Sequence, residues 1–172
     1  MTENGVRAGS AAVKELPWPV LDEEAVDEAT VLIVDDEEMV VRSLNSLLTL
    51  ESRYEVKTFL SPRKALDVVR EEEIHVVLAD FLMPDLDGIS FLKEVRACQP
   101  EATRLLLTGY ADKENAIRAI NDAGLYYYLE KPWDNEQLKI VIRNGVERSL
   151  LFRDLSAQIA ALEEAHEELA GF

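Results

Sequence analysis

Short apolar segments alternate with amphipathic segments five times along this chain, which limits the folds that it can adopt. The apolar segments read as buried strands and cover residues 30–36, 54–60, 74–80, 103–108 and 125–130. Segments with apolar residues at helical spacing follow them at residues 37–51, 61–72, 88–99, 112–124 and 134–155. Strict alternation predicts an α/β fold in which helices cover both faces of a parallel sheet. Because crossovers are right-handed, we expect a doubly wound five-stranded sheet of order 2-1-3-4-5.

The charge of the chain argues against several classes of function. Its formal charge is −16 and its isoelectric point is near 4.5. Binding to nucleic-acid phosphates or to anionic lipids needs a basic face, so we expect no direct nucleic-acid partner and no membrane contact. The single cysteine, Cys98, allows no intrachain disulfide, and no apolar run approaches the ~20 residues of a membrane span. We therefore expect a cytoplasmic protein.

The pattern divides the chain into three parts. Residues 1–28 contain glycine, serine and proline, then an acidic stretch, without strong periodicity. They predict a flexible acidic N-terminal arm with a short helix near residues 22–28. Residues 29–148 hold the strand–helix units and form the predicted domain. Residues 149–172 continue the last helical pattern beyond that domain.

Polar and charged side chains stand where the predicted strands end. Asp35 and Asp36 end the first strand, and Asp80 ends the third. Thr108 ends the fourth strand, and Lys131 follows the fifth. Ligand sites of doubly wound sheets lie beyond the carboxyl ends of the strands, where the strand order reverses. We therefore expect these five side chains to meet in one cleft.

Three carboxylates in one cleft predict a bound divalent cation. Acidic groups placed this close repel one another unless a cation lies among them. Carboxylate oxygens suit Mg²⁺ (or Mn²⁺), which keeps part of its water shell. Lys131 adds a compact positive charge that can pair with Asp80 or with a phosphoryl oxygen. Asp80 is then placed to attack phosphorus and to form an aspartyl phosphate.

Four motifs in this chain resemble those of the receiver domains of two-component response regulators. They are "LIVDDE", "LADFLMPDLDG", "LLLTGYAD" and "YLEKPWD", in this order, within roughly residues 30–150. The resemblance implies a flavodoxin-like fold and a phosphoryl group supplied by a histidine kinase or a phosphotransfer protein. It also implies self-catalysed phosphoryl transfer and dephosphorylation, without enzyme activity on other substrates.

The resemblance assigns the acceptor and the metal ligands. Asp80 matches the phosphoacceptor, Asp36 the direct metal ligand and Asp35 its acidic neighbour. The third protein ligand in the family is the backbone carbonyl two residues after the acceptor, which belongs here to Leu82. Families of this kind often carry a polar residue at that position. Leu82 there, and Tyr110 two residues after Thr108, leave the lifetime of the phosphate open.

The resemblance also assigns the switch residues. Thr108 matches the hydroxyl that reaches the phosphoryl group, and Lys131 matches the lysine of the cleft. Tyr128 matches the aromatic residue that turns inward when Thr108 moves. Gly88 would allow an unusual backbone angle, and Pro132 would hold its turn, often through a cis bond. The residues with a structural part near the site are Met83, Pro84, Gly88, Gly109 and Pro132.

The last helical pattern continues beyond the predicted domain. Five apolar residues and one histidine are spaced 3, 4, 3, 4 and 3 residues apart, namely Phe152, Leu155, Ile159, Leu162, His166 and Leu169. This spacing is that of a coiled-coil seam over about two and a half heptads. We expect a parallel homodimer through this helix. The alternative is a tail that folds back on the domain or frays, because an isolated exposed helix is marginal in water.

The sequence thus predicts a phosphorylation-controlled signalling switch that acts through its last helix on a dimer or on a downstream protein partner. One alternative is a constitutive dimeric scaffold with a vestigial receiver. Another is a receiver fragment of a larger protein whose output domain, a cyclic-dinucleotide phosphodiesterase or a kinase, is missing. Phosphatases with an aspartyl phosphate intermediate need a second acid two residues after the nucleophile, where this chain has Leu82.

Overall fold

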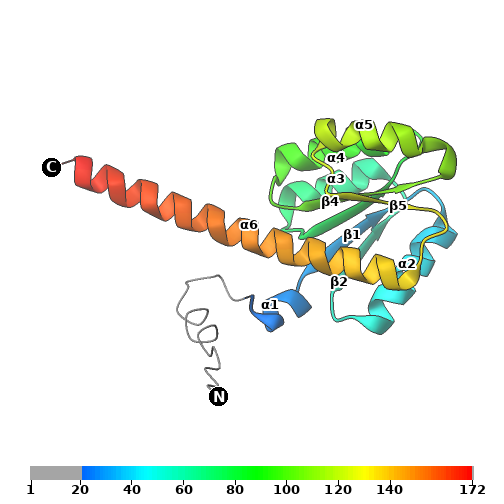
Figure 1. Ribbon diagram of the computed structural model, residues 1–172, viewed down its shortest axis with the longest axis horizontal. Coiled ribbons are helices and arrows are strands. Elements are labelled where there is room, and N and C mark those ends of the chain that lie inside the picture. The colour runs from blue at the N-terminus through cyan, green and yellow to red at the C-terminus, as the bar shows by residue number, and fades with distance from the viewer. Residues whose placement is uncertain (1–20, 172) are drawn as a thin grey trace, which may run out of the picture.

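A computed structural model describes residues 21–171 and shows a parallel sheet between two layers of helices (Figure 1). The strands are β1 (Thr30–Val34), β2 (Glu55–Phe59), β3 (Val76–Asp80), β4 (Thr103–Thr108) and β5 (Tyr127–Glu130). All neighbouring strands pair in parallel, in the order β2-β1-β3-β4-β5. The predicted doubly wound, flavodoxin-like sheet is confirmed.

Two hydrophobic cores hold the helices on the sheet. One face is covered by α1 (Glu23–Asp27), α2 (Glu38–Glu51) and α6 (Asn135–Ala170). The other face is covered by α3 (Pro62–Glu71), α4 (Gly88–Cys98) and α5 (Lys113–Ala123), which follows the short 3₁₀ turn η2 (Tyr110–Asp112). Side chains alternate between the faces of a strand, so Leu32 packs in one core and Ile33 in the other. Both faces are apolar, which explains the continuous apolar runs of the central strands.

Local signals in the sequence fix several helix ends. Ser61 caps α3 by accepting a hydrogen bond from the backbone N–H of Lys64, and Pro62 opens that helix. Asp134 caps α6 in the same way. Gly124 ends α5 with φ of 60°, a left-handed conformation that glycine adopts without a steric penalty.

The packed body begins before the predicted boundary at residue 29. Residues 1–20 of the predicted arm lie outside the described residues, but α1 belongs to the folded body. Val26 is fully buried in the core that α2 and α6 form with the sheet. The carboxylate of Glu23 lies 3.0 Å from the guanidinium of Arg143 on α6. The short helix expected near residues 22–28 is therefore present and docked, because one apolar side chain anchors it.

Helix α6 runs without interruption across the predicted boundary between residues 148 and 149. Gly145 lets the helix approach the sheet closely, since a Cβ there would lie 3.1 Å from Thr103. Arg153 still contacts the body by donating to the Ile74 carbonyl at 2.8 Å. Beyond this point α6 projects away from the body (Figure 1), so it does not fold back on the domain. Within residues 21–171, no helix is long and apolar enough to cross a membrane.

A partly buried histidine, His75, makes the stability of the fold depend on pH. The Nδ1 of His75 accepts a hydrogen bond from the backbone N–H of Thr30 at 3.0 Å, which requires a neutral ring. Burial, assisted by the charge of Arg153, holds the pKa of His75 below its ordinary value of 6.5. The unfolded chain therefore binds this proton more readily, so the contribution of His75 to stability is present above pH 6.5 and is lost as the pH falls.

We expect His75→Asn to flatten the dependence of the free energy of unfolding on pH between about pH 7 and pH 5, because the titrating ring is removed. Urea unfolding at several pH values measures this slope. The other histidine, His166, lies on the exposed part of α6 and provides the comparison. If His166→Asn flattened the slope and His75→Asn did not, the pH dependence would belong to the projecting helix.

Candidate functional site

The parallel register brings the expected side chains to one edge of the sheet. Val34 of β1 pairs with Ala79 of β3, so the next residues, Asp35 and Asp80, lie side by side. Asp80 pairs with Leu107, which precedes Thr108 at the end of β4. Asp80 and Thr108 are the last residues of their strands, and Asp35 directly follows the last residue of β1. The predicted convergence therefore follows from the sheet order.

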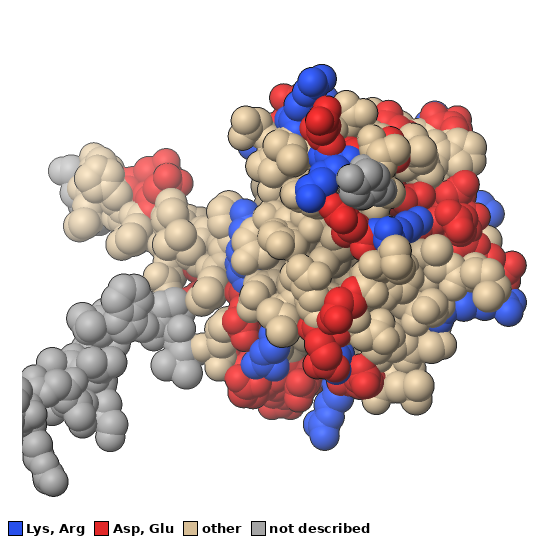
Figure 2. All heavy atoms as spheres, turned by 45° about the vertical axis from the view of Figure 1, so that its right-hand side comes forward, with Lys and Arg blue, Asp and Glu red and all other residues tan. Residues whose placement is uncertain are grey.

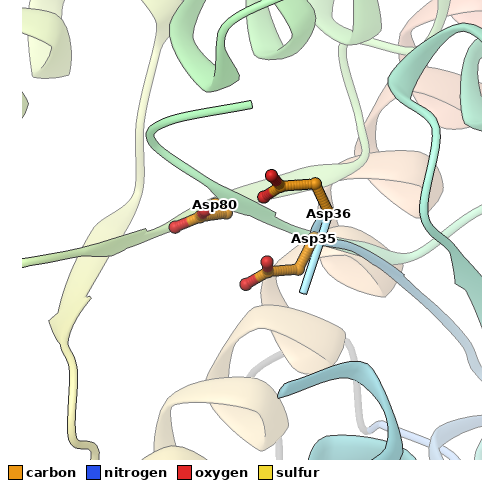
Figure 3. Close-up of side chains that lie close together, drawn as sticks. All are labelled: Asp35, Asp36 and Asp80. Carbon is orange, nitrogen blue, oxygen red and sulfur yellow. The ribbon is translucent and has the colours of Figure 1, made fainter. Parts of the chain in front are cut away.

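Three carboxylates form a compact group at this edge. One oxygen from each of Asp35, Asp36 and Asp80 lies within 4.8 Å of the others. Figure 3 shows all three carboxylates directed to the same side, two from the end of β1 and one from the end of β3. Asp35 and Asp80 are buried, whereas Asp36 is exposed. A set of oxygen donors with one side open to solvent fits a hard divalent cation that keeps part of its water.

Lys131 neutralises part of this charge. Its Nζ lies 2.8 Å from Asp35 and 3.1 Å from Asp80. The carboxylate of Glu37 lies 3.8 Å from the same Nζ, at the exposed rim. Glu37 was not among the site residues predicted from the sequence, although it directly follows the acidic pair Asp35 and Asp36. The ammonium group therefore bridges the two buried carboxylates.

Burial dominates the titration of this group. It raises the pKa of Asp35 and of Asp80 above the ordinary value, and the ion pairs with Lys131 offset only part of the effect. Burial also disfavours the ammonium of Lys131, but its bonds to Asp35 and Asp80 hold its pKa above the ordinary value. The site thus contains more negative charge than Lys131 compensates. A second cation would remove this excess.

Thr108 presents an unused donor at the same edge. Its side chain is fully buried, and within residues 21–171 its Oγ1 has no hydrogen-bond partner. A buried hydroxyl without a partner is costly, and most buried polar groups avoid it. Such a group points to a ligand oxygen that completes the site.

Glycine is needed at position 88, after the loop that follows Asp80, for a different reason from the one predicted from the sequence. Gly88 does not adopt the unusual backbone angle that the sequence suggested, so that expectation was wrong. Instead, a Cβ at this position would lie 2.1 Å from the carbonyl oxygen of Asp80. Glycine is required because α4 begins directly against the end of β3. Asp85 is the residue with positive φ (74°) in this loop, and it forms an ion pair with Arg63 that sequence reasoning missed.

The remaining predicted residues lie on β5 or in the segments that follow β3, β4 and β5. Tyr128 of β5 is half-buried, packs on the α3–α5 core, and stacks on Tyr127 with ring centroids 5.8 Å apart. Met83 is buried, whereas the side chain of Leu82 is 62% exposed. The peptide bond between Lys131 and Pro132 is cis. Gly109 has φ of −77°, so its backbone tolerates a side chain.

Comparison with known families assigns most of this chain to one of them. Residues 31–143 match the response regulator receiver domain family. A solved response regulator receiver domain protein from Clostridium thermocellum superposes with a TM-score of 0.68 and 34% identity, covering 72% of this chain and 98% of that chain.

Curated relatives are considerably longer than this chain. The hydrogenase transcriptional regulatory protein HoxA of Cupriavidus necator is 40% identical over 129 residues, which are 74% of this chain and 26% of that protein. The regulatory protein AtoC of Escherichia coli is 34% identical over 78% of this chain and 28% of its own length. The chain thus spans about a quarter of these two relatives.

Proposed function

This chain belongs to the response regulator receiver domain family of two-component signalling systems, and we propose that Asp80 is its phosphoacceptor. The observation that carries the proposal is that three carboxylates, the bridging Lys131 and the hydroxyl of Thr108, which has no partner among residues 21–171, meet at one sheet edge. The donor is a histidine kinase or a phosphotransfer protein. Receiver domains bind Mg²⁺ through an acidic pocket, and the carboxylate group of this chain fits that chemistry.

The residues of the site divide the reaction among them. A carboxylate oxygen of Asp80 attacks phosphorus, the bond from phosphorus to the donor nitrogen breaks, and that nitrogen keeps the electron pair. Lys131 already touches Asp80 and is placed to hold an oxygen of the transferred group. Asp35, Asp36, Asp80 and the Leu82 carbonyl would hold Mg²⁺ or Mn²⁺, which would neutralise charge on that group.

The charge of a phosphoryl group on Asp80 acts on residues of β4 and β5. A phosphoryl group on Asp80 offers an acceptor for the hydroxyl of Thr108, which is buried without a partner within the described chain. Movement of Thr108 leaves room for Tyr128, which lies on the adjacent strand and is only half-buried. The surface formed by α5, β5 and α6 then repacks.

The output passes through α6. Because this helix is continuous from the receiver into the exposed seam, a change at its base alters the position of the seam. We propose that the seam forms a homodimer, and that the dimer or a downstream protein partner carries the signal in the cytoplasm. The protein catalyses only its own phosphorylation and dephosphorylation. Its charge of −16 supports neither direct nucleic-acid binding nor membrane binding.

The proposed acceptor is tested by phosphoryl uptake from a small donor such as acetyl phosphate. Intact-mass spectrometry should show one added phosphoryl group in the presence of Mg²⁺ and none when the cation is chelated. Absence of uptake under both conditions would favour the constitutive scaffold with a vestigial receiver. Uptake on a residue other than Asp80 would overturn the assignment of the site.

A substitution at Thr108 tests the switch. Thr108→Val is expected to leave the free energy of unfolding unchanged or to raise it by about 1 kcal/mol, because the lost hydroxyl has no partner within the described chain. Its stabilisation by beryllofluoride, a phosphoryl mimic, should be smaller than that of the original chain. Urea unfolding with Mg²⁺, with and without the mimic, measures both effects.

Thr103 is the matched control for this substitution. Its hydroxyl is also buried at a β4 position but donates to the Gly145 carbonyl at 2.7 Å. Thr103→Val should therefore lower the free energy of unfolding by about 1–2 kcal/mol. A comparable loss in Thr108→Val without the mimic would mean that the Thr108 hydroxyl is already satisfied in the resting protein.

A further inference from the structure

We propose that two copies of this chain pair through α6 in antiparallel orientation, so that the acidic end of each helix lies beside the start of the seam of the other. This inference rests on the proposed homodimer and specifies its geometry. It differs from the parallel coiled coil that the heptad spacing alone suggested. The register of the seam permits this orientation, and two features of α6 favour it, namely the distribution of charge and a groove at the base of the helix.

The seam is exposed along the projecting part of α6. Exposure ranges from 40% at Phe152 to 76% at Leu169, with Leu155, Ile159 and Leu162 between them in the sequence and all above 40%. Apolar side chains in a row at this exposure are typical of a surface that another helix covers. The helix leaves the body after Arg153, so the body itself does not cover this row.

The register of the seam is compatible with an antiparallel pair. In such a pair each a position lies opposite a d position of the other helix. Phe152 then faces the partner's Leu169, Leu155 faces the partner's His166, and Ile159 faces the partner's Leu162. Each of the six seam residues of one chain thus faces a seam residue of the partner. The antiparallel pair contains two layers that each set one His166 against Leu155, and the parallel pair contains one layer of two His166 side chains. Both place two imidazoles in the seam, so His166 does not decide between them.

Charge distinguishes the two orientations. Residues 163–169 carry four glutamates and no lysine or arginine, and Figure 2 shows acidic side chains gathered near the far end of the projecting helix. A parallel pair would set these two acidic segments side by side, at an interaxial distance of about 8–10 Å. Only Glu163 flanks the seam, so most of these carboxylates are farther apart than the axes and their repulsion is largely screened at a Debye length of about 8 Å. The stronger difference arises at Arg148, seven residues before Leu155, because a parallel pair would set this seam position against its own copy. The antiparallel pair separates the acidic segments.

The antiparallel partner of the acidic segment is less negative. Residues 152–158 lie opposite residues 163–169, and their charges, one from Arg153 and one from Asp154, cancel. Arg148 lies one turn further toward the body. Its guanidinium stands 5.2 Å from the ring centre of Tyr126, and among residues 21–171 no carboxylate forms an ion pair with it. The start of the seam thus offers an arginine to the acidic end of a second helix.

A groove of about 430 Å³ lies at the same place. Its apolar lining comes from Tyr126, Leu151, Phe152 and Leu155. Its polar lining comes from Asn144, Arg148 and Glu147, and the carboxylate of Glu147 forms an ion pair with Arg143. The seam therefore continues from the projecting helix onto the receiver. In the antiparallel pair the end of the partner's seam, at the partner's Leu169, enters this groove. In a parallel pair the two grooves and the two Arg148 side chains would face each other.

Site-directed cross-linking tests the orientation. We would replace Cys98, the only cysteine, by serine and prepare Leu155→Cys and His166→Cys in that background. Each variant is treated with a short dimaleimide alone and as an equilibrated mixture, with Mg²⁺ and with or without beryllofluoride. The antiparallel pair predicts cross-linked dimer in the mixture and none from either variant alone.

The outcomes separate this inference from the proposed homodimer. Cross-linked dimer from each variant alone would overturn the antiparallel orientation and leave a parallel homodimer. Light scattering on the uncross-linked proteins gives the mass independently. A monomer in every condition would overturn both the dimer and its orientation, while phosphoryl uptake by Asp80 would still stand.

Discussion

Asp80→Asn is expected to abolish phosphoryl uptake from acetyl phosphate, because the amide lacks the nucleophilic carboxylate oxygen. The variant should also lose most of the stabilisation that Mg²⁺ gives, since one of three carboxylates within 4.8 Å is removed. Without the cation its free energy of unfolding should rise by on the order of 1 kcal/mol. The reason is that burial raises the pKa of Asp80, so its charged form opposes folding at neutral pH.

The matched control is Asp67→Asn. Asp67 lies on α3 with a side chain that is 75% exposed, and its ion pair with Arg70 is a surface contact. Neither phosphoryl uptake nor the effect of Mg²⁺ should change in this variant. Intact mass and urea unfolding, with the cation and with a chelator, measure both quantities. Retained uptake in Asp80→Asn would place the acceptor elsewhere.

Gly88→Ala is expected to destabilise the fold by about 3 kcal/mol or more. A Cβ at this position would lie 2.1 Å from the carbonyl oxygen of Asp80, and that contact is with backbone, which cannot rotate away. Either the start of α4 or the end of β3 must shift. Because Asp80 ends β3, we also expect slower phosphoryl uptake in whatever fraction of the variant folds. Urea unfolding measures the loss.

Gly109→Ala is the control for this effect. Gly109 also lies beside the site, but its φ is −77° and an added Cβ would meet its nearest neighbour at 3.7 Å. Its free energy of unfolding should stay within about 0.5 kcal/mol of the original. Equal losses in the two variants would show that glycine at position 88 is not required by close approach.

The sequence predicted the site because its residues occupy equivalent positions in a repeated unit. Asp35, Asp80 and Thr108 each stand at or directly after the end of a strand, and parallel strands bring such positions to one edge. Capping signals such as Ser61 and Asp134 act over three residues, so they too could be recognised locally. The resemblance to receiver domains added the residue roles.

Interactions between distant segments were not predictable in this way. The docking of α1 depends on the packing of Val26 in the core beneath α2 and α6, and no local sequence pattern predicts this contact. The ion pair between Arg63 and Asp85 joins the start of α3 to the loop after β3, and its partners are 22 residues apart. Gly88 was recognised as special for the wrong reason, because the constraint comes from a neighbouring strand and not from its own φ.

By itself, the sequence determined the strand order, the chemistry of the sheet edge and the continuation of the last helix. The strand order follows from the repeated strand–helix alternation and the right-handedness of crossovers, and the other two depend on periodicity and on residue type at fixed offsets. Only the tertiary structure decided that Lys131 bridges Asp35 and Asp80, that Thr108 has no partner within residues 21–171, and that α6 projects from the body beyond Arg153. These properties depend on distances between elements, which are set when the side chains of both cores pack together.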